Sequence, residues 1–117
     1  MTAEIYYQRI RFYSNRMFLL EGDEKEEAYE KVSHSLELNE EVLANYDKGI
    51  DSEEDRQLFD KLSILWNEYK PRILQVVDYE KSGQSQIAKD LLFGEVADIG
   101  SSLQDAFSAL SEYNTNE

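Results

Sequence analysis

Apolar side chains in the first twenty residues recur at alternating steps of four and three. They are Tyr6, Ile10, Tyr13, Met17 and Leu20. This alternation is typical of the packed seam of a helix. A second apolar stripe repeats every seven residues beside it and consists of Ile5, Phe12 and Leu19. The pattern predicts a helix over residues 3–20 whose apolar arc is wide enough to contact more than one neighbour.

Three longer segments, residues 24–48, 53–81 and 85–113, carry a similar rhythm and are also predicted to be helices. The seam of the first is Tyr29, Val32, Leu36, Asn39, Leu43 and Tyr46. The seam of the second is Phe59, Leu62, Trp66, Tyr69, Ile73 and Val76. The seam of the third is Leu92, Val96, Ile99, Leu103, Ala106, Leu110 and Tyr113.

Polar residues mark where two of these helices begin. Asp23 stands just before the helix predicted over residues 24–48 and is expected to be its N-cap. Ser52 and Asp55 have the spacing of a capping box at the start of the helix predicted over residues 53–81.

Three residues inside the segments disfavour a regular helix. Pro71 lacks a backbone donor and predicts a kink. Gly94 and Gly100 lower helix propensity, and both are expected to allow a close approach between helices.

The connections are short, so consecutive helices must run antiparallel. The predicted fold is all-α, an up-down-up-down four-helix bundle formed by residues 1–117. The first helix is shorter than the others, and we expect its natural start to lie upstream of Met1. The beginning of the first helix and the end of the fourth would then lie at the same end of the bundle, a geometry suited to a membrane-anchored protein.

Charge and composition exclude several classes of function. A net charge of −13 disfavours nucleic acids and anionic membrane surfaces as partners. The absence of cysteine excludes disulfides and thiolate nucleophiles. The charge is also uneven: three arginines and one glutamate give residues 1–20 a charge of +2, which leaves −15 for the other 97 residues.

Arg9 and Arg16 lie within the wide apolar arc of the first helix. Burying a guanidinium there is costly unless it meets an acceptor. One interpretation is an anion-binding ladder that grips the carboxylate of a ligand or a partner. The alternatives are an internal salt bridge to the acidic remainder of the chain, or side chains that extend to the surface. In a dimer these interpretations can coexist.

Other residues give weaker indications of a ligand, metal or catalytic site. Trp66 and Tyr69 stand near Pro71 and would line any space that a kink opens, although such aromatics also serve as core. His34 is the single histidine, so a di-metal centre is not expected. The chain has no phosphate loop, nucleophile elbow or zinc motif, and we predict neither enzymatic activity nor a cofactor or metal.

Several short motifs together resemble a known family. They are Ala44-Asn45-Tyr46, Trp66-Asn67-Glu68-Tyr69, Glu80-Lys81-Ser82-Gly83, Ala88-Lys89-Asp90-Leu91-Leu92 and Leu110-Ser111-Glu112-Tyr113-Asn114. The chain resembles the four-helix-bundle sensory domain of bacterial methyl-accepting chemotaxis proteins, which also occurs in some sensor histidine kinases. The resemblance implies an extracytoplasmic ligand-binding domain, flanked in the parent protein by two transmembrane helices. It also implies a homodimer with the first helix at the interface.

The ligand is less well defined by this resemblance. Arg16 stands where aspartate-type receptors place an interface arginine, but Arg9 and Arg11 do not reproduce the rest of that spacing. Residues 84–87 lack the aromatic and threonine pattern that closes an aspartate pocket. We therefore predict a small carboxylate-bearing ligand, an organic acid or amino acid, without assigning it as aspartate.

We expect Arg16, with Arg9 as second choice, to contact this ligand beside Tyr13, Tyr69 and Trp66. Ile5, Phe12 and Leu19 are the predicted dimer contacts. The alternative function is a structural or adaptor bundle that uses the first helix for a protein partner and has no small ligand.

Overall fold

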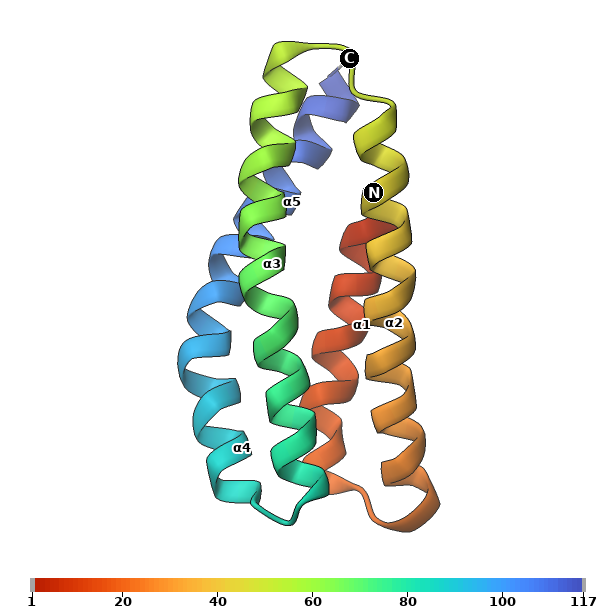
Figure 1. The fold of residues 1–117 in the computed structure, drawn as a ribbon, viewed down its shortest axis with the longest axis vertical. Coiled ribbons are helices and arrows are strands. Elements are labelled where there is room, and N and C mark those ends of the chain that lie inside the picture. The colour runs from red at the N-terminus through yellow and green to blue at the C-terminus, as the bar shows by residue number, and fades with distance from the viewer. Residues whose placement is uncertain (1, 117) are drawn as a thin grey trace.

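The computed structural model describes residues 2–116, which form helices joined by short connections (Figure 1). Helix α1 (Thr2–Arg16) ends in the 3₁₀ turn η1 (Met17–Leu19) and is followed by α2 (Gly22–Lys48) and α3 (Glu53–Lys81). The next three elements form one continuous column, which we call the fourth helix. They are α4 (Ser85–Leu91), the π-helical turn η2 (Leu92–Val96) and α5 (Ala97–Asn116).

The helices run alternately up and down along a molecule that measures 47 × 25 × 19 Å, which confirms the predicted four-helix bundle (Figure 1). The α1–α2 and α3–α4 connections lie at the lower end in Figure 1, and the α2–α3 connection lies at the upper end. The N-terminus lies part of the way up the bundle, and the C-terminus lies at the top.

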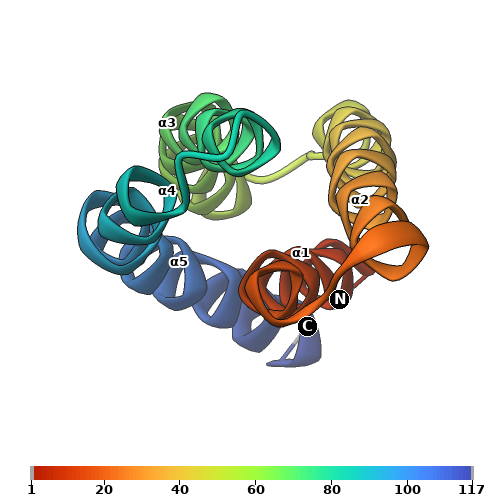
Figure 2. The same cartoon turned by 90° about the horizontal axis from the view of Figure 1, so that it is seen from below.

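The bundle is built from two helical hairpins, α1 with α2 and α3 with the fourth helix. The backbones approach most closely within each hairpin, whereas few backbone approaches join one hairpin to the other. Viewed along the axis, the four columns surround a shared interior (Figure 2). Large side chains such as Trp66, Tyr69 and Phe107 are buried in the core.

The predicted cap at Ser52 is confirmed, because its Oγ accepts a hydrogen bond of 3.1 Å from the Asp55 backbone N–H. The predicted cap at Asp23 is wrong. Helix α2 begins at Gly22, and Asp23 lies in its first turn. The φ angle of Gly22 is 60°, a left-handed conformation that glycine adopts without a steric penalty. A glycine therefore turns the chain into α2 without a side-chain cap.

The core face of α1 is rotated from the predicted one. The buried residues of α1 and η1 are Ala3, Tyr7, Ile10, Ser14 and Met17, which keep the four-three rhythm. Tyr6 and Tyr13 are only half-buried. The Tyr7 hydroxyl donates a hydrogen bond of 2.9 Å to the backbone carbonyl of Gly100, and its ring packs against Tyr69 and Phe107 at centroid distances of 5.4 Å. Tyr7 is therefore the tyrosine that faces the core.

The predicted seams of α2 and α3 agree better with the buried residues of the structure. Every predicted seam residue of α3 is buried, and so is every one of α2 except the half-buried Tyr46. Helix α3 continues as one helix through Pro71.

The fourth helix departs from regular α-helix at η2, and buried residues recur along it at three consecutive steps of four: Ala88, Leu92, Val96 and Gly100. In an α-helix each such step advances about 40°, so three of them would turn Gly100 about 120° away from Ala88. The π turn holds more residues per turn and keeps all four on one face.

The two glycines of the fourth helix have different surroundings. A Cβ added at Gly100 would lie 2.9 Å from the Tyr7 hydroxyl, so the predicted close approach is found there. The prediction is wrong for Gly94, where an added Cβ would meet nothing within 4 Å.

A candidate ligand cleft between the first and fourth helices

A cleft of about 310 Å³ opens between α1 and the fourth helix, with α3 behind it. From α1 it is lined by Tyr7, Arg11, Ser14 and Asn15. From α3 it is lined by Tyr69. From the fourth helix it is lined by Leu92, Phe93, Val96, Ala97, Gly100, Ser101, Gln104 and Asp105. The cleft thus lies between the two hairpins and combines apolar walls with charged and amide groups.

Two tyrosines contribute buried walls to the cleft. The rings of Tyr7 and Tyr69 meet edge to face, with an interplanar angle of 69°. Burial raises the pKa of both hydroxyls, and the nearby Arg11 guanidinium lowers the pKa of each by a smaller amount. Both hydroxyls are therefore neutral at physiological pH and offer hydrogen bonds rather than negative charge.

Arg11 is the cation of the cleft. Its guanidinium lies 5.9 Å from the centre of the Tyr7 ring, and the residue is exposed. Among residues 2–116, no carboxylate forms an ion pair with it. Asp105 also lines the cleft, from α5. The cleft therefore presents a guanidinium without a protein counter-ion and a carboxylate from the opposite wall.

Sequence reasoning did not select Arg11, because the seam through Tyr6 and Tyr13 placed Arg9 and Arg16 in the apolar arc instead. The feature of the sequence that could have identified Arg11 is its spacing of four residues from Tyr7. Residues four apart are neighbours on one face of a helix, so a buried Tyr7 brings Arg11 to the edge of the core.

A polar seam joins α1 to α5 beside the cleft. The Gln8 amide donates to Gln104 Oε1, and Gln104 Nε2 donates to Glu4 Oε2 at 2.8 Å. Ser111 Oγ donates to Glu4 Oε1 at 3.3 Å. Hydrogen bonds thus supplement apolar packing in holding the first and fourth helices together.

Arg9 and Arg16 lie outside the cleft, on the exposed surface of α1. Their guanidiniums stand 5.3 Å from the centre of the Tyr6 ring and 5.6 Å from that of Phe12. In the described chain neither forms an ion pair with a carboxylate, so the internal salt bridge is not observed, and the side chains extend over their own helix to the surface. Tyr13 is half-buried and packs edge to face on Phe12 at 5.1 Å.

The stripe Ile5, Phe12 and Leu19 is strongly exposed, at 60%, 55% and 83%. It lies opposite the buried face of α1. The structure therefore leaves these three apolar side chains uncovered on the outside of the hairpin.

Trp66 and Tyr69 are core residues, as the alternative interpretation had it. The Trp66 indole N–H donates to Glu40 Oε1 at 2.7 Å, and the Trp66 ring lies 6.0 Å from that of Tyr69. Of the five residues predicted to contact the ligand, only Tyr69 lines the cleft. Arg9 and Tyr13 line a second, more open hollow beside Arg11, and Arg16 lines neither, so the structure does not bring the five into one site.

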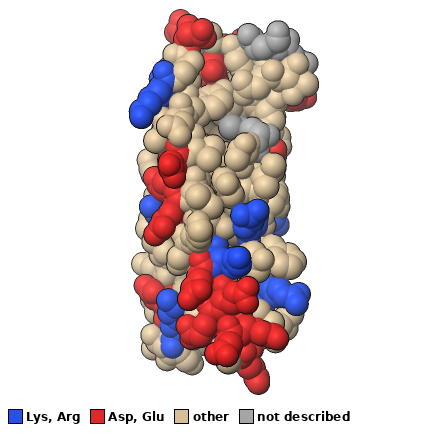
Figure 3. Space-filling view, turned by 90° about the vertical axis from the view of Figure 1, so that its right-hand side faces the viewer, with Lys and Arg blue, Asp and Glu red and all other residues tan. Residues whose placement is uncertain are grey.

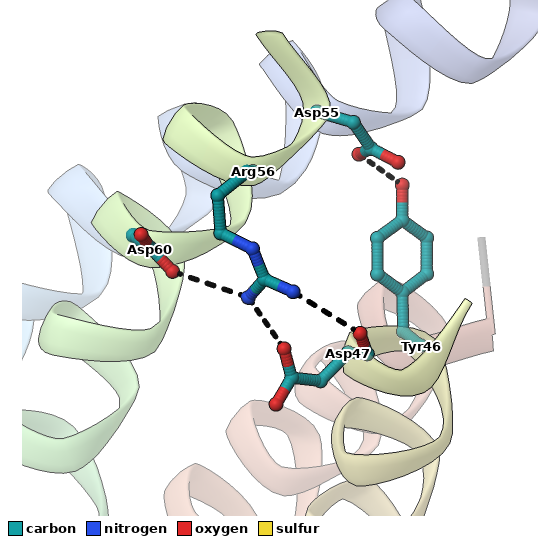
Figure 4. Close-up of polar contacts among 5 residues, drawn as sticks. All are labelled: Tyr46, Asp47, Asp55, Arg56 and Asp60. Atoms are coloured by element: carbon teal, nitrogen blue, oxygen red, sulfur yellow. Dashed lines mark hydrogen bonds and ion pairs between the residues drawn. The ribbon is translucent and has the colours of Figure 1, made fainter. Parts of the chain in front are cut away.

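A second polar cluster, at the upper end of the bundle, has a structural role (Figure 4). Arg56 on α3 contacts the Asp47 carboxylate at 2.5 Å and the Asp47 backbone carbonyl at 3.2 Å, and it also reaches Asp60. The Tyr46 hydroxyl donates to Asp55 at 2.6 Å, and burial together with this carboxylate raises the pKa of Tyr46 to about 12. These groups satisfy one another and clamp α2 to α3.

Acidic side chains gather at the opposite end of the molecule. Figure 3 shows them low on the face that carries α1 and α2, near the connection between these helices. They include the exposed Glu21, Asp23, Glu24, Glu26 and Glu27. Within residues 2–116, no three acidic, histidine or cysteine side chains are grouped so that they could hold a metal ion.

Comparison with known proteins agrees with this architecture. Residues 2–117 match the family described as "Four helix bundle sensory module for signal transduction". A protein of Acetivibrio thermocellus named as a sensory transducer is 31% identical over 106 residues, which cover 91% of this chain. The chain spans only 19% of that relative's length. No solved structure matches significantly.

In the described part of the chain, no helix combines the length and the apolar character that a membrane span requires. The resemblance inferred from the sequence motifs is confirmed. The chain belongs to the family of four-helix-bundle sensory modules for signal transduction, of the methyl-accepting chemotaxis type.

Proposed function

We propose that this sensory module is the extracytoplasmic domain of a membrane-anchored receptor, and that it binds a small carboxylate-bearing molecule in the cleft between α1 and the fourth helix. The observation that supports this ligand is Arg11. It lines the cleft, and no carboxylate within residues 2–116 pairs with it. A guanidinium presents a planar pair of donors that fits a carboxylate, so Arg11 would hold the acid group.

The other lining groups suit a small polar ligand. Ser101 and Asn15 offer hydrogen bonds, and Asp105 on the opposite wall would favour a ligand that also carries an ammonium group. The volume of about 310 Å³ lies at the lower end of the usual range for ligand pockets, about 300 to 1,000 Å³. The ligand is therefore an organic acid or an amino acid rather than a large molecule.

The charge of the domain makes the position of Arg11 important. With a net charge of −13, most of the surface repels an anion, including the acidic end seen in Figure 3. The three arginines of α1 provide a local region where an anion is attracted. An anionic ligand is consequently directed to this helix.

The module would act as a homodimer through α1. Ile5, Phe12 and Leu19 are exposed at a spacing of seven residues, which is the repeat of a helix–helix contact. In such a dimer, Arg9 and Arg16 would flank the contact and could meet a ligand or a carboxylate of the partner subunit. Signalling would follow from a small displacement of the fourth helix relative to α1 when the cleft is filled.

The assembly is tested by sedimentation over a range of protein concentrations. Phe12→Glu places a charge in the proposed contact and should abolish dimer formation. The matched control is Ile64→Glu on α3, where the native residue is similarly exposed at 62%. A wild-type domain that stays monomeric at millimolar concentration, with and without acids, would refute the dimer.

The ligand is tested by calorimetric titration with a panel of organic acids and amino acids. Arg11→Gln should weaken binding about 10- to 150-fold, because the loss of a charge-assisted hydrogen bond costs about 1.5–3 kcal/mol. Arg16→Gln distinguishes the cleft from the outer face of α1. If Arg16→Gln alone abolishes binding, the ligand site lies on the outer face. If no member of the panel binds the wild-type domain, the adaptor function is favoured.

A further inference from the structure

The π turn of the fourth helix contains one residue more than its packing requires. Apart from Ala106, which lies beside Phe107, buried positions from Ala88 to Leu110 follow steps of four, four, four, three, four and three. If one residue were removed at Gly94, the same side chains would follow steps of four and three in strict alternation. That is the pattern of an uninterrupted α-helix with one buried face. The core therefore does not demand the wide turn.

The wide turn coincides with the candidate ligand cleft. Three of its five residues, Leu92, Phe93 and Val96, line the cleft. Leu92 and Val96 are buried, whereas Phe93 is 62% exposed. Single π turns within α-helices are frequently found at functional sites.

Phe93 is an aromatic side chain that the fold leaves largely uncovered at this cleft. Its ring centroid lies 6.5 Å from that of Phe18, which belongs to η1. The other aromatic residues that line the cleft, Tyr7 and Tyr69, are buried. A ligand between Arg11 and Phe93 would thus have a cation for its acid group and aromatic surface for its body.

We propose that the π turn is the specificity element of this cleft, and that its extra residue places Phe93 against the apolar body of an aromatic or branched carboxylate. This inference rests on the proposed function, because it presupposes that Arg11 binds the acid group. It adds the class of ligand and identifies the feature of the sequence that selects it. A short acid such as acetate satisfies Arg11 but leaves Phe93 without a contact.

The experiment compares benzoate with acetate in calorimetric titrations of the purified domain. Wild type should bind benzoate about tenfold more tightly, as expected for one aromatic contact beyond the shared acid group. Phe93→Ala should reduce this preference to about twofold or less. Ile87→Ala is its matched control, because Ile87 is an exposed apolar residue of α4 outside the cleft, and it should retain the preference.

Deletion of Gly94 tests the turn itself. The shortened chain should keep a melting temperature equal to or above that of wild type and lose the preference for benzoate. Gly94→Ala preserves the number of residues, its added Cβ meets nothing within 4 Å, and it should retain the preference.

Two results would overturn the inference while leaving the proposed function intact. One is an unchanged preference for benzoate in Phe93→Ala. The other is a melting temperature that falls by more than about 5 °C on deletion of Gly94, which would show that packing requires the π turn. A wild-type domain that binds neither acid at millimolar concentration would remove both the carboxylate function and the inference built on it.

Discussion

Asn39 is a polar residue in the centre of the bundle whose replacement should stabilise the protein. Its relative exposure is 0%, and it occupies a seam position of α2 between Leu36 and Leu43. Neither its Nδ2 nor its Oδ1 has a hydrogen-bond partner among the described residues. Folding therefore removes an amide from water without giving it a new partner.

The size of the effect follows from this desolvation. A buried polar group without a partner lowers the free energy of unfolding by about 1–3 kcal/mol. Leucine has the same number and branching of side-chain heavy atoms as asparagine, although it is larger, and it buries apolar surface and has a better helix propensity. Asn39→Leu should therefore raise the free energy of unfolding by about 1–3 kcal/mol. At about 4 °C per kcal/mol for a domain of this size, the melting temperature should rise by roughly 4–12 °C.

The assay is urea and thermal unfolding followed by circular dichroism at the helical band. The matched control is Asn45→Leu, an exposed position of the same helix, which should change stability by less than about 0.5 kcal/mol. If Asn39→Leu lowers the free energy of unfolding by more than about 1 kcal/mol while the control is neutral, the amide has a stabilising partner in the folded state. The reasoning from desolvation would then be refuted.

Three further predictions concern stability. Glu80→Gln removes an ion pair to α2 in which the carboxylate side chain is only 2% exposed, and it should cost about 1–3 kcal/mol in urea unfolding, whereas the same change at the exposed Glu95 should be nearly silent. Gly100→Ala should lower the melting temperature by several degrees, about 1–3 kcal/mol, because its Cβ would lie 2.9 Å from the Tyr7 hydroxyl; an unchanged value would mean that α1 and α5 separate freely. The raised pKa of Tyr46, about 12 in the folded state against 10.0, favours the folded form below pH 10, and this contribution is lost as the pH rises from about 10 to 12. The free energy of unfolding of Tyr46→Phe should accordingly fall less than that of wild type across that pH interval. An equal fall in both proteins would contradict the raised pKa of Tyr46.

Much of the fold was predictable because the long helices carry a regular seam. The predicted core of α3 is entirely buried, since residues such as Leu62, Ile73 and Val76 leave only one face for the core. In α1 two adjacent tyrosines, Tyr6 and Tyr7, fit the rhythm equally well. The choice between them depends on the hydrogen bond from Tyr7 to Gly100, which joins residues 93 positions apart. Local periodicity contains no information about such a contact.

The cleft was harder to predict for the same reason. The observed seam of α1 keeps Ile10 and Met17 but has Tyr7 and Ser14 in place of Tyr6 and Tyr13. This partial rotation of the helix changes the arginine that lies beside the core from Arg9 or Arg16 to Arg11. The π turn had a signal in the three consecutive steps of four. It was missed because Gly100 carries no apolar side chain, so Ile99 was assigned to the seam instead. A glycine can be a buried seam residue when its backbone receives a large side chain from a neighbouring helix.

The two-hairpin construction has a consequence for how the domain opens. Contacts within each hairpin join segments that are close in the sequence, so each hairpin closes a short loop and can form early and independently. Amide hydrogens inside a hairpin should consequently exchange with solvent slowly, through global unfolding. Sub-global opening should separate one hairpin from the other as rigid bodies. The domain therefore deforms most easily where the two hairpins meet, and the candidate ligand cleft lies along this boundary.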